Sequence, residues 1–353
     1  MLDDEKVYKR YDKDEVAFGI ERLSEQVQIA WQQTRRIQVP KAYRGVENIV
    51  VAGMGGSALG IHVIVNTLSE MIKKPVIITR DYRLPGFVNS KTLVILSSFS
   101  GGTEEILYAG REAKKRKAKM MVITTGGKLA AFGKREKLPM YNFEPGDLAK
   151  QPRLGVGFTL AGTLGLLQRA GMVKVGRQEI DAFASAMSEV VDTCALDVKV
   201  SKNPAKTVAQ EIEGRPILIV ASEHLSASAH IMRNQISETG KQFVECHKIP
   251  KMNHYFMEGL TYPKGFVKKF VVVMLKSKFY HRQNQKRYDI TAELFEKLGA
   301  KVVEYDAGGG SRFAEAGELL QFSTFTSYYL AMLNKVNPIK IPYVDWFKEE
   351  LSK

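Results

Sequence analysis

Two segments in the first third of the chain share a pattern that only a few folds can accommodate. Residues 48–60 and 93–105 each begin with a run of apolar, mostly β-branched residues, break into glycine and hydroxyl residues, and resume with helical spacing. The runs are apolar throughout instead of alternating, which is typical of parallel strands buried on both faces. Parallel neighbours need crossover connections, and the helical patterns supply them. The sequence therefore predicts an α/β fold with doubly wound parallel sheets flanked by helices.

The same alternation restarts after residue 203, and 353 residues are ample for two cores, so we predict two α/β domains in tandem. Their predicted extents are residues 1–155 and 156–353. The predicted strands span 48–52, 75–79, 92–97, 119–124, 216–222, 242–246, 269–275 and 301–305. The predicted helices span 14–35, 57–70, 103–117, 156–172, 177–195, 204–213, 225–239, 279–298, 314–335 and 343–351.

The chain is basic, with a net charge of +14 and a pI near 9.5, which raises the question of a nucleic-acid partner. The basic residues are spread widely, and the cluster 114–117 falls on a predicted helix with no stacking platform beside it. We therefore expect no nucleic acid, while a basic field remains compatible with small anionic substrates. No apolar run approaches the ~20 residues that span a bilayer, so no membrane contact is expected.

The N-terminus and the cysteines indicate a cytoplasmic protein. Residues 1–6 are charged and lack the apolar core of a signal peptide. Cys194 and Cys246 do not make a disulfide framework, and neither has the spacing of a metal ligand. No cluster of His, Asp or Glu with ligand spacing is present either, so we expect no metal.

The two glycine-rich loops predict an anion site. Glycines allow a tight turn that brings backbone N–H groups close to a ligand, and a following helix adds the positive end of its dipole. The loops offer hydroxyl groups but no lysine of the kind found in a nucleotide-binding P-loop. A small phosphomonoester suits this chemistry. The residues predicted to hold it are Gly55, Gly56, Ser57, Ser98, Ser100 and Thr103.

Two other interpretations of these loops stay open. One is a glycine-lined turn that binds nothing. The other is a dinucleotide site, because Gly53 and Gly55 precede a predicted helix and Asp81 follows the second strand at roughly the distance of a ribose-binding acid. The second hydroxyl-rich loop favours the phosphomonoester. Both loops fall at the carboxyl ends of strands, where open α/β sheets bind ligands, and a dinucleotide needs only one of them.

These loops resemble the sugar isomerase (SIS) domain, and a wider set of motifs resembles the bifunctional phosphoglucose/phosphomannose isomerases over nearly the whole chain. The wider set comprises Gln151-Pro152-Arg153, Gln235-Ile236-Ser237-Glu238, Asn253-His254 and Asn337-Pro338. The resemblance implies two SIS-type domains and an isomerase that interconverts glucose 6-phosphate or mannose 6-phosphate with fructose 6-phosphate through an enediolate. It also implies a homodimer with shared active sites and no cofactor.

Three residues match catalytic positions of that family. Glu238 resembles the base that moves a proton between C2 and C1, and Arg153 the cation that faces the enediolate. His254 resembles the histidine that opens the sugar ring, which the neighbouring subunit contributes. For each residue a plain structural role is the alternative: a carboxylate on a solvated helix face, a salt bridge at a domain boundary, or a surface histidine.

Departures from the family pattern bear on substrate scope. Thr239 follows the base where the family usually has Asn, and Tyr255 follows the Asn-His pair where it tends to have Asn. Ile339 and Lys340 follow the C-terminal proline, where the family has a hydroxyl residue linked to acceptance of both C2 epimers. Two alternatives therefore remain: an isomerase for a different phosphosugar, and a sugar-phosphate-binding module without catalysis.

Overall fold

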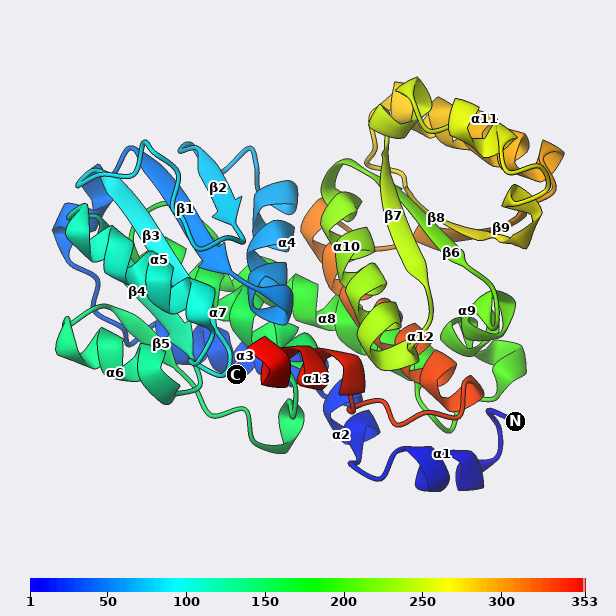
Figure 1. Cartoon of the computed structure of the whole chain (residues 1–353), viewed down its shortest axis with the longest axis horizontal. Helices are drawn as coiled ribbons and strands as arrows, with labels where there is room; N and C mark the ends of the chain where they lie inside the picture. The colour runs from blue at the N-terminus through cyan, green and yellow to red at the C-terminus, as the bar shows by residue number, and fades with distance from the viewer. Residues whose placement is uncertain (352) are drawn as a thin grey trace.

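In a computed structural model that describes residues 1–351 and 353, two parallel β-sheets lie side by side, each flanked by helices (Figure 1). The first sheet has the strand order β2-β1-β3-β4-β5 and the second β7-β6-β8-β9, and every pairing is parallel. This confirms the predicted doubly wound α/β fold. The strands are β1 Asn48–Gly53, β2 Val76–Thr79, β3 Thr92–Ser98, β4 Lys119–Thr124, β5 Met140–Asn142, β6 Ile217–Ser222, β7 Val244–Ile249, β8 Val271–Ser277 and β9 Lys301–Ala307.

The helices connect these strands and cover both faces of each sheet. None of them, within the described part of the chain, is long and apolar enough to cross a membrane. They are α1 Glu5–Tyr11, α2 Val16–Glu21, α3 Leu23–Thr34, α4 Leu59–Thr67, α5 Glu104–Lys115, α6 Gly127–Arg135, α7 Val156–Arg169, α8 Arg177–Cys194, α9 Pro204–Ile212, α10 Ser226–Gln235, α11 Arg282–Lys297, α12 Arg312–Leu333 and α13 Pro342–Leu351.

The first sheet is buried on both faces, which explains why its strands are apolar throughout. Side chains of one parity, such as Val50 and Val94, pack against α5 and α6. Those of the other parity, such as Val51 and Ile95, pack against α3, α4 and α7. Successive residues of a strand point to opposite faces, so a strand covered on both sides must be apolar at every position.

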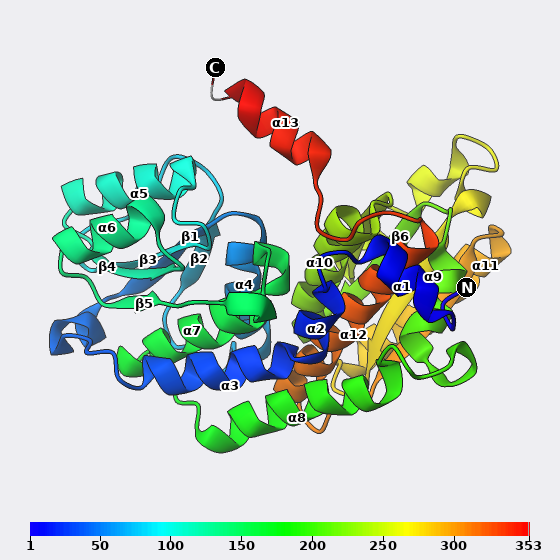
Figure 2. The ribbon, with the colours of Figure 1, turned by 90° about the horizontal axis from the view of Figure 1, so that it is seen from below.

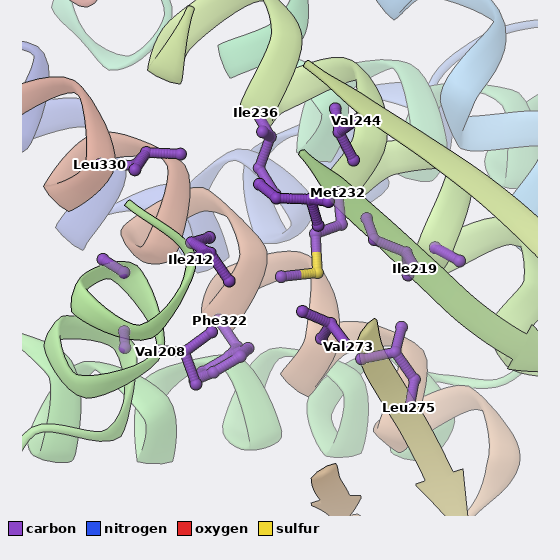
Figure 3. Close-up of a cluster of buried hydrophobic side chains, with 14 of the residues drawn as sticks. Val208, Ile212, Ile219, Met232, Ile236, Val244, Val273, Leu275, Phe322 and Leu330 are labelled. Carbon is purple, nitrogen blue, oxygen red and sulfur yellow. The ribbon is translucent and has the colours of Figure 1, made fainter. Parts of the chain in front are cut away.

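The second sheet has a core of its own, in which Met232 and Ile236 pack against strand residues such as Ile219 and Val273 (Figure 3). Helices α9, α10 and α12 surround this cluster. The 22-residue helix α12 also ties the halves together, because Leu320 belongs to the first core while other residues of the same helix belong to the second.

Chain segments cross between the halves in other places. Helices α1 and α2 pack on the second core although they open the chain, and α7 packs on the first. Figure 2 shows α8 running beneath both halves and α13 extending away from the rest of the chain. The division at 155/156 stays a prediction about chain segments; in space, side chains from each segment reach the core of the other half.

Three sequence expectations differ from the structure. The helix expected over 14–35 is broken into α2 and α3, and the carboxylate of Asp12 accepts the backbone N–H groups of Val16 and Ala17 at the start of α2. Helix α6 and strand β5 were not expected. The helix expected over 225–239 ends at Gln235, and residues 236–240 form one turn of π-helix.

Candidate active site

The two predicted anion-binding loops meet at the carboxyl edge of the first sheet. They leave neighbouring strands, since Gly53 of β1 lies in register with Ser97 of β3. Two hydrogen bonds join them directly: the Ser97 hydroxyl donates to the carbonyl of Ser57 at 2.8 Å, and the backbone N–H of Phe99 donates to Ser57 Oγ at 2.9 Å. The loops predicted to act together therefore form one structure.

Within the second loop, Ser98 has a structural role and Ser100 and Thr103 lie nearer the surface. The buried Ser98 hydroxyl lies 2.7 Å from Thr103 Oγ1 and accepts the backbone N–H of Gly101 at 3.1 Å. Gly101 has φ +67°, and a Cβ there would lie 1.9 Å from the carbonyl oxygen of Gly126, so only glycine fits. Ser100 is exposed, and Thr103 caps the N-terminus of α5, where the helix dipole favours an anion.

Arg153 lies next to the first loop because the segment before it packs on a glycine. A Cβ at Gly56 would lie 2.6 Å from the carbonyl carbon of Pro152, an approach that any side chain would prevent. Arg153 is only 1% exposed. Its Nη2 donates to the carbonyls of Pro338 at 2.7 Å and Ile339 at 2.8 Å, and its Nε donates to the Thr239 hydroxyl at 3.0 Å.

The remaining nitrogen of Arg153 points to Glu238. Nη1 lies 3.5 Å from Glu238 Oε2, and the glutamate side chain is 32% exposed, so the pair lies at the border of solvent. Burial lowers the pKa of Arg153, and the carboxylate of Glu238 opposes that shift. The structure thus brings together three predicted elements: the hydroxyl-lined loops, Arg153 and Glu238.

The backbone around Glu238 has an unusual conformation that the sequence did not indicate. Glu238 lies in the π-helical turn, a form that is rare and is found frequently at functional sites. Lys241 ends the turn with φ +56°, and its ammonium group donates to the carbonyls of Glu238 at 2.6 Å and Asn337 at 3.2 Å. Burial and the charge of Arg153 lower the pKa of Lys241 to about 8. Lys241 therefore holds the turn that carries Glu238.

Gln235 connects the same turn to the Arg153 segment. Its Nε2 donates to the hydroxyl of Thr324 at 2.8 Å and, at 3.4 Å, to the carbonyl of Arg153. The motif Gln235-Ile236-Ser237-Glu238 marked this helix in the sequence. Only the structure reveals the hydrogen bonds that Gln235 and Lys241 make around this turn.

His254 lies apart from Glu238 within one chain. It is exposed and ends a 3₁₀ turn that follows β7, while the π-helical turn precedes β7. A six-residue strand spans about 20 Å, so the two residues lie toward opposite ends of β7. Asn253 fixes the His254 turn by donating to the hydroxyl of Thr291 on α11 at 3.0 Å.

The C-terminal segment reaches the site through its backbone. Asn337 Oδ1 accepts the backbone N–H groups of Ile339 at 2.8 Å and Lys340 at 3.1 Å, which fixes the turn whose carbonyls Arg153 binds. The side chain of Ile339 packs against the second core, and Lys340 is exposed. Over residues 1–351 and 353, no three His, Cys, Asp or Glu side chains are grouped so that they could hold a metal ion.

Comparisons with known proteins identify relatives over nearly the whole chain. A family model described as the bacterial phospho-glucose isomerase C-terminal SIS domain matches residues 201–351. The bifunctional phosphoglucose/phosphomannose isomerase of Caldicellulosiruptor bescii is 31% identical, over 95% of this chain and 98% of that protein. A protein of the same description from Aquifex aeolicus is 30% identical, over 92% of this chain and 95% of its own length.

Among solved structures, a hypothetical protein from Thermus thermophilus superimposes with a TM-score of 0.73 at 18% identity, over 99% of this chain and 92% of that chain. Similarity at this identity speaks for the fold alone. The sequence relatives carry the assignment further, because their similarity extends over more than nine tenths of this chain and of their own length. The chain belongs to the bifunctional phosphoglucose/phosphomannose isomerase family.

Proposed function

We propose that this chain is an aldose–ketose isomerase that interconverts glucose 6-phosphate and mannose 6-phosphate with fructose 6-phosphate. The relatives named for these activities support the proposal. The single observation that carries it is the position of Arg153. The segment that carries Arg153 packs on the Gly56 loop, and Arg153 Nη1 lies 3.5 Å from Glu238 Oε2. Arg153 therefore lies between the predicted anion-binding loop and the carboxylate of Glu238.

The chemistry follows from that arrangement. With its phosphate held by Ser57, Ser100 and Thr103, an open-chain sugar can extend toward Glu238. The Glu238 carboxylate removes the proton from C2 and returns it to C1, while the hydroxyl proton of O2 passes to O1, so that C1=O becomes a hydroxyl and C2 becomes the carbonyl. The enediolate between these steps carries negative charge on its oxygens. A positioned base contributes about 10²–10⁴-fold to such a step. Arg153 stabilises the developing charge, and its hydrogen bonds to Thr239, Pro338 and Ile339 hold it in place beforehand.

Ring opening is assigned to His254 of a second copy of this chain. The length of β7 separates His254 from Glu238 within one chain, and the histidine is exposed where a neighbouring copy could approach it. A neutral imidazole can move a proton between the ring oxygen and O1 near neutral pH. The proposed active unit is a two-fold symmetric dimer in which each site takes Glu238 from one chain and His254 from the other.

The activity is tested by incubating the purified protein with glucose 6-phosphate or mannose 6-phosphate, in the presence of a chelator, and following fructose 6-phosphate with a coupled assay. We expect turnover of both sugars. Binding without turnover would indicate a sugar-phosphate-binding module. Turnover of another phosphosugar alone would indicate an isomerase of different specificity.

The shared site is tested by complementation. Glu238→Gln and His254→Ala proteins are each expected to be inactive. After equal mixing and random subunit exchange, half of the dimers are heterodimers with one intact site each, so activity should return to about a quarter of that of the unmodified protein. If both residues served one chain's site, mixing would restore nothing even after proven exchange.

We also propose a cytoplasmic location, which Cys194 and Cys246 support because both thiols are free. Fractionation of the native cells, with this chain detected by antibody, checks the location.

A further inference from the structure

A second group of basic side chains lies between the two halves of the molecule. It comprises His62 on α4, Arg80 just after β2, His230 and Arg233 on α10, and Lys248 on β7. Helices α4 and α10 lie side by side between β2 and β7 (Figure 1). The rings of His62 and His230 stack across this contact with centroids 5.3 Å apart and planes at 23°, and Arg80 Nη2 hydrogen-bonds to His62 Nε2. We call these five residues the seam cluster.

The seam cluster has more positive than negative charge around it. The carboxylate paired with it is that of Glu245, which lies 3.8 Å from Arg233 Nη1 and is 56% exposed. Arg80 and Arg233 are close enough to repel each other, since the charge of Arg233 together with burial lowers the pKa of Arg80. Among the ion pairs of the described residues, Arg80, Arg233 and Lys248 thus have one carboxylate partner, the half-exposed Glu245 beside Arg233.

Both histidines are neutral at physiological pH. Burial and the charges of Arg80 and Lys248 lower the pKa of His62 to about 4. Burial and the charge of Arg233, with smaller contributions from His62, Arg80 and Lys248, lower the pKa of His230 to about 3. Each neutral imidazole still has one N–H to donate. An anion bound nearby would offset the positive charges that lower these values, so it would raise the pKa of both His62 and His230.

The seam cluster is separate from the Arg153–Glu238 pair. Arg153 bonds to Thr239, Glu238, Pro338 and Ile339, none of which belongs to the cluster. On α10, His230 and Arg233 share one face because they are three residues apart. Gln235, which binds the Arg153 carbonyl, is rotated by about 200° from Arg233 at 100° per residue, and so faces away from the cluster.

We propose that the seam cluster is a second anion site, which takes a phosphate dianion and thereby connects the two α/β halves. The ligand is either free phosphate or the phosphoryl group of a small metabolite. Guanidinium groups bind phosphate oxygens through paired N–H donors. Nε and Nη2 of Arg233 donate to the side-chain oxygen of Asn234 at 3.3 and 3.1 Å, and a phosphate would take the place of that oxygen. Lys248 adds a point charge, and each neutral imidazole has one N–H to donate. Because Arg80 belongs to the first half and Arg233 to the second, an occupied site links them.

The test is calorimetric titration of the unmodified protein with inorganic phosphate at constant ionic strength. We expect two sites per chain. The Arg80→Gln/Arg233→Gln protein should keep one site and lose at least about tenfold in affinity at the other, the effect of removing a charge-assisted contact. Ser100→Ala/Thr103→Ala should weaken the active-site phosphate and leave the seam site intact. Lys115→Gln/Lys117→Gln removes the same charge from an exposed helix end and should change neither site.

A second measurement follows the two histidines of the unmodified protein. In the imidazole NMR spectrum of the unmodified protein, phosphate should move the His62 and His230 signals and raise their pKa values, with His62→Gln identifying the first signal. The Ser100→Ala/Thr103→Ala protein distinguishes the two ligand sources. If fructose 6-phosphate binds at the seam cluster more tightly than phosphate, the ligand is a phosphosugar, and equal affinity identifies the phosphoryl group alone.

One phosphate per chain in the unmodified protein, or an unchanged second site in Arg80→Gln/Arg233→Gln, would overturn the proposal. Failure of the isomerase assay would leave this result unaffected.

Discussion

The two sheets share a strand order, but their carboxyl edges differ in chemistry. In both, the second strand lies beside the first and the third and fourth follow on the other side. At the edge of the first sheet, the hydroxyl loops open toward solvent at Ser100. At the edge of the second, the equivalent strands end in Ser222 and Ser277, whose side chains are both buried, so this edge is closed there. Glu315 of α12 is fully buried there, 2.6 Å from Ser277 Oγ and 2.7 Å from His224 Nε2.

This difference shows that topology alone does not locate a ligand. Open α/β sheets bind ligands at their carboxyl edges, and each half of this molecule has hydroxyl groups there. In the second half, however, an internal carboxylate already accepts the donors that a phosphate would use. The proposed chemical contribution of the second half comes instead from the turn after α10, where Glu238 faces Arg153. We therefore propose that the first half binds the phosphate and that the second half performs the proton transfer.

The largest expected effect separates these two roles. Glu238→Gln should lower kcat by roughly two decades or more, because a general base is lost, while KM for the phosphosugar changes little. Steady-state kinetics with glucose 6-phosphate measure both constants, and Glu296→Gln, an exposed glutamate on α11, is the control. Turnover near that of the unmodified protein would remove Glu238 from the mechanism.

The next effect concerns the closed edge of the second sheet. Glu315→Gln replaces a buried charged acceptor of two groups, so the free energy of unfolding should fall by about 1.5–3 kcal/mol, the range for hydrogen bonds to charged groups. Urea denaturation measures the loss. KM should stay unchanged, because the proposed phosphate site lies at the edge of the other sheet, and a large rise in KM would contradict the comparison.

A smaller effect is expected at the open edge. Ser100→Ala/Thr103→Ala removes two hydroxyl groups assigned to the phosphate, and at about 0.5–1.5 kcal/mol each the combined loss should raise KM by roughly five- to a hundredfold. The loss of the exposed Ser100 hydroxyl should affect folding little, whereas the loss of Thr103 Oγ1 removes a hydrogen bond to Ser98 and should lower the free energy of unfolding by about 0.5–1.5 kcal/mol. Ser222→Ala is the matched control, because its hydroxyl donates to the carbonyl of Ile249 at the corresponding edge of the second sheet. Equal rises in KM for both proteins would mean that the two edges do not differ as described.

The smallest effect concerns the sugar end of the site. C2 epimers present their hydrogen to the base only after rotation about C2–C3, and a hydroxyl near Ile339 could hold the rotated form. Ile339→Thr should therefore increase kcat/KM for mannose 6-phosphate relative to glucose 6-phosphate by roughly two- to tenfold, equivalent to about 0.5–1.5 kcal/mol. Arg153 binds only the backbone carbonyl of residue 339, so the substitution keeps that contact. An unchanged ratio would assign epimer scope to another group.

Local sequence pattern determined most of the fold. The bounds of β4 agree with those expected, and β1 and β3 extend only one residue beyond theirs, because an uninterrupted apolar run bounded by polar residues defines a buried strand. The pattern could not define α6 and β5. Helix α6 begins at Gly127 directly after Gly126, and glycine is a poor helix former, while β5 has only three residues, too few to show a period. The break between α2 and α3 likewise depends on Asp12, whose carboxylate also binds the Tyr328 hydroxyl on α12.

For the site, too, the local sequence pattern determined one part and the tertiary packing another. Glycines and hydroxyl residues at the ends of β1 and β3 sufficed to predict an anion site, because backbone geometry and helix dipoles are local properties. The sequence also marked Arg153, Glu238 and Ile339, but it does not give the distances between these residues. Only the tertiary structure decided that Arg153 lies between the carboxylate of Glu238 and the carbonyl of Ile339, residues 85 and 186 positions away. The physical reason is that hydrogen bonds between distant segments depend on how α10, α12 and the C-terminal segment pack, and no periodicity along the chain encodes that packing.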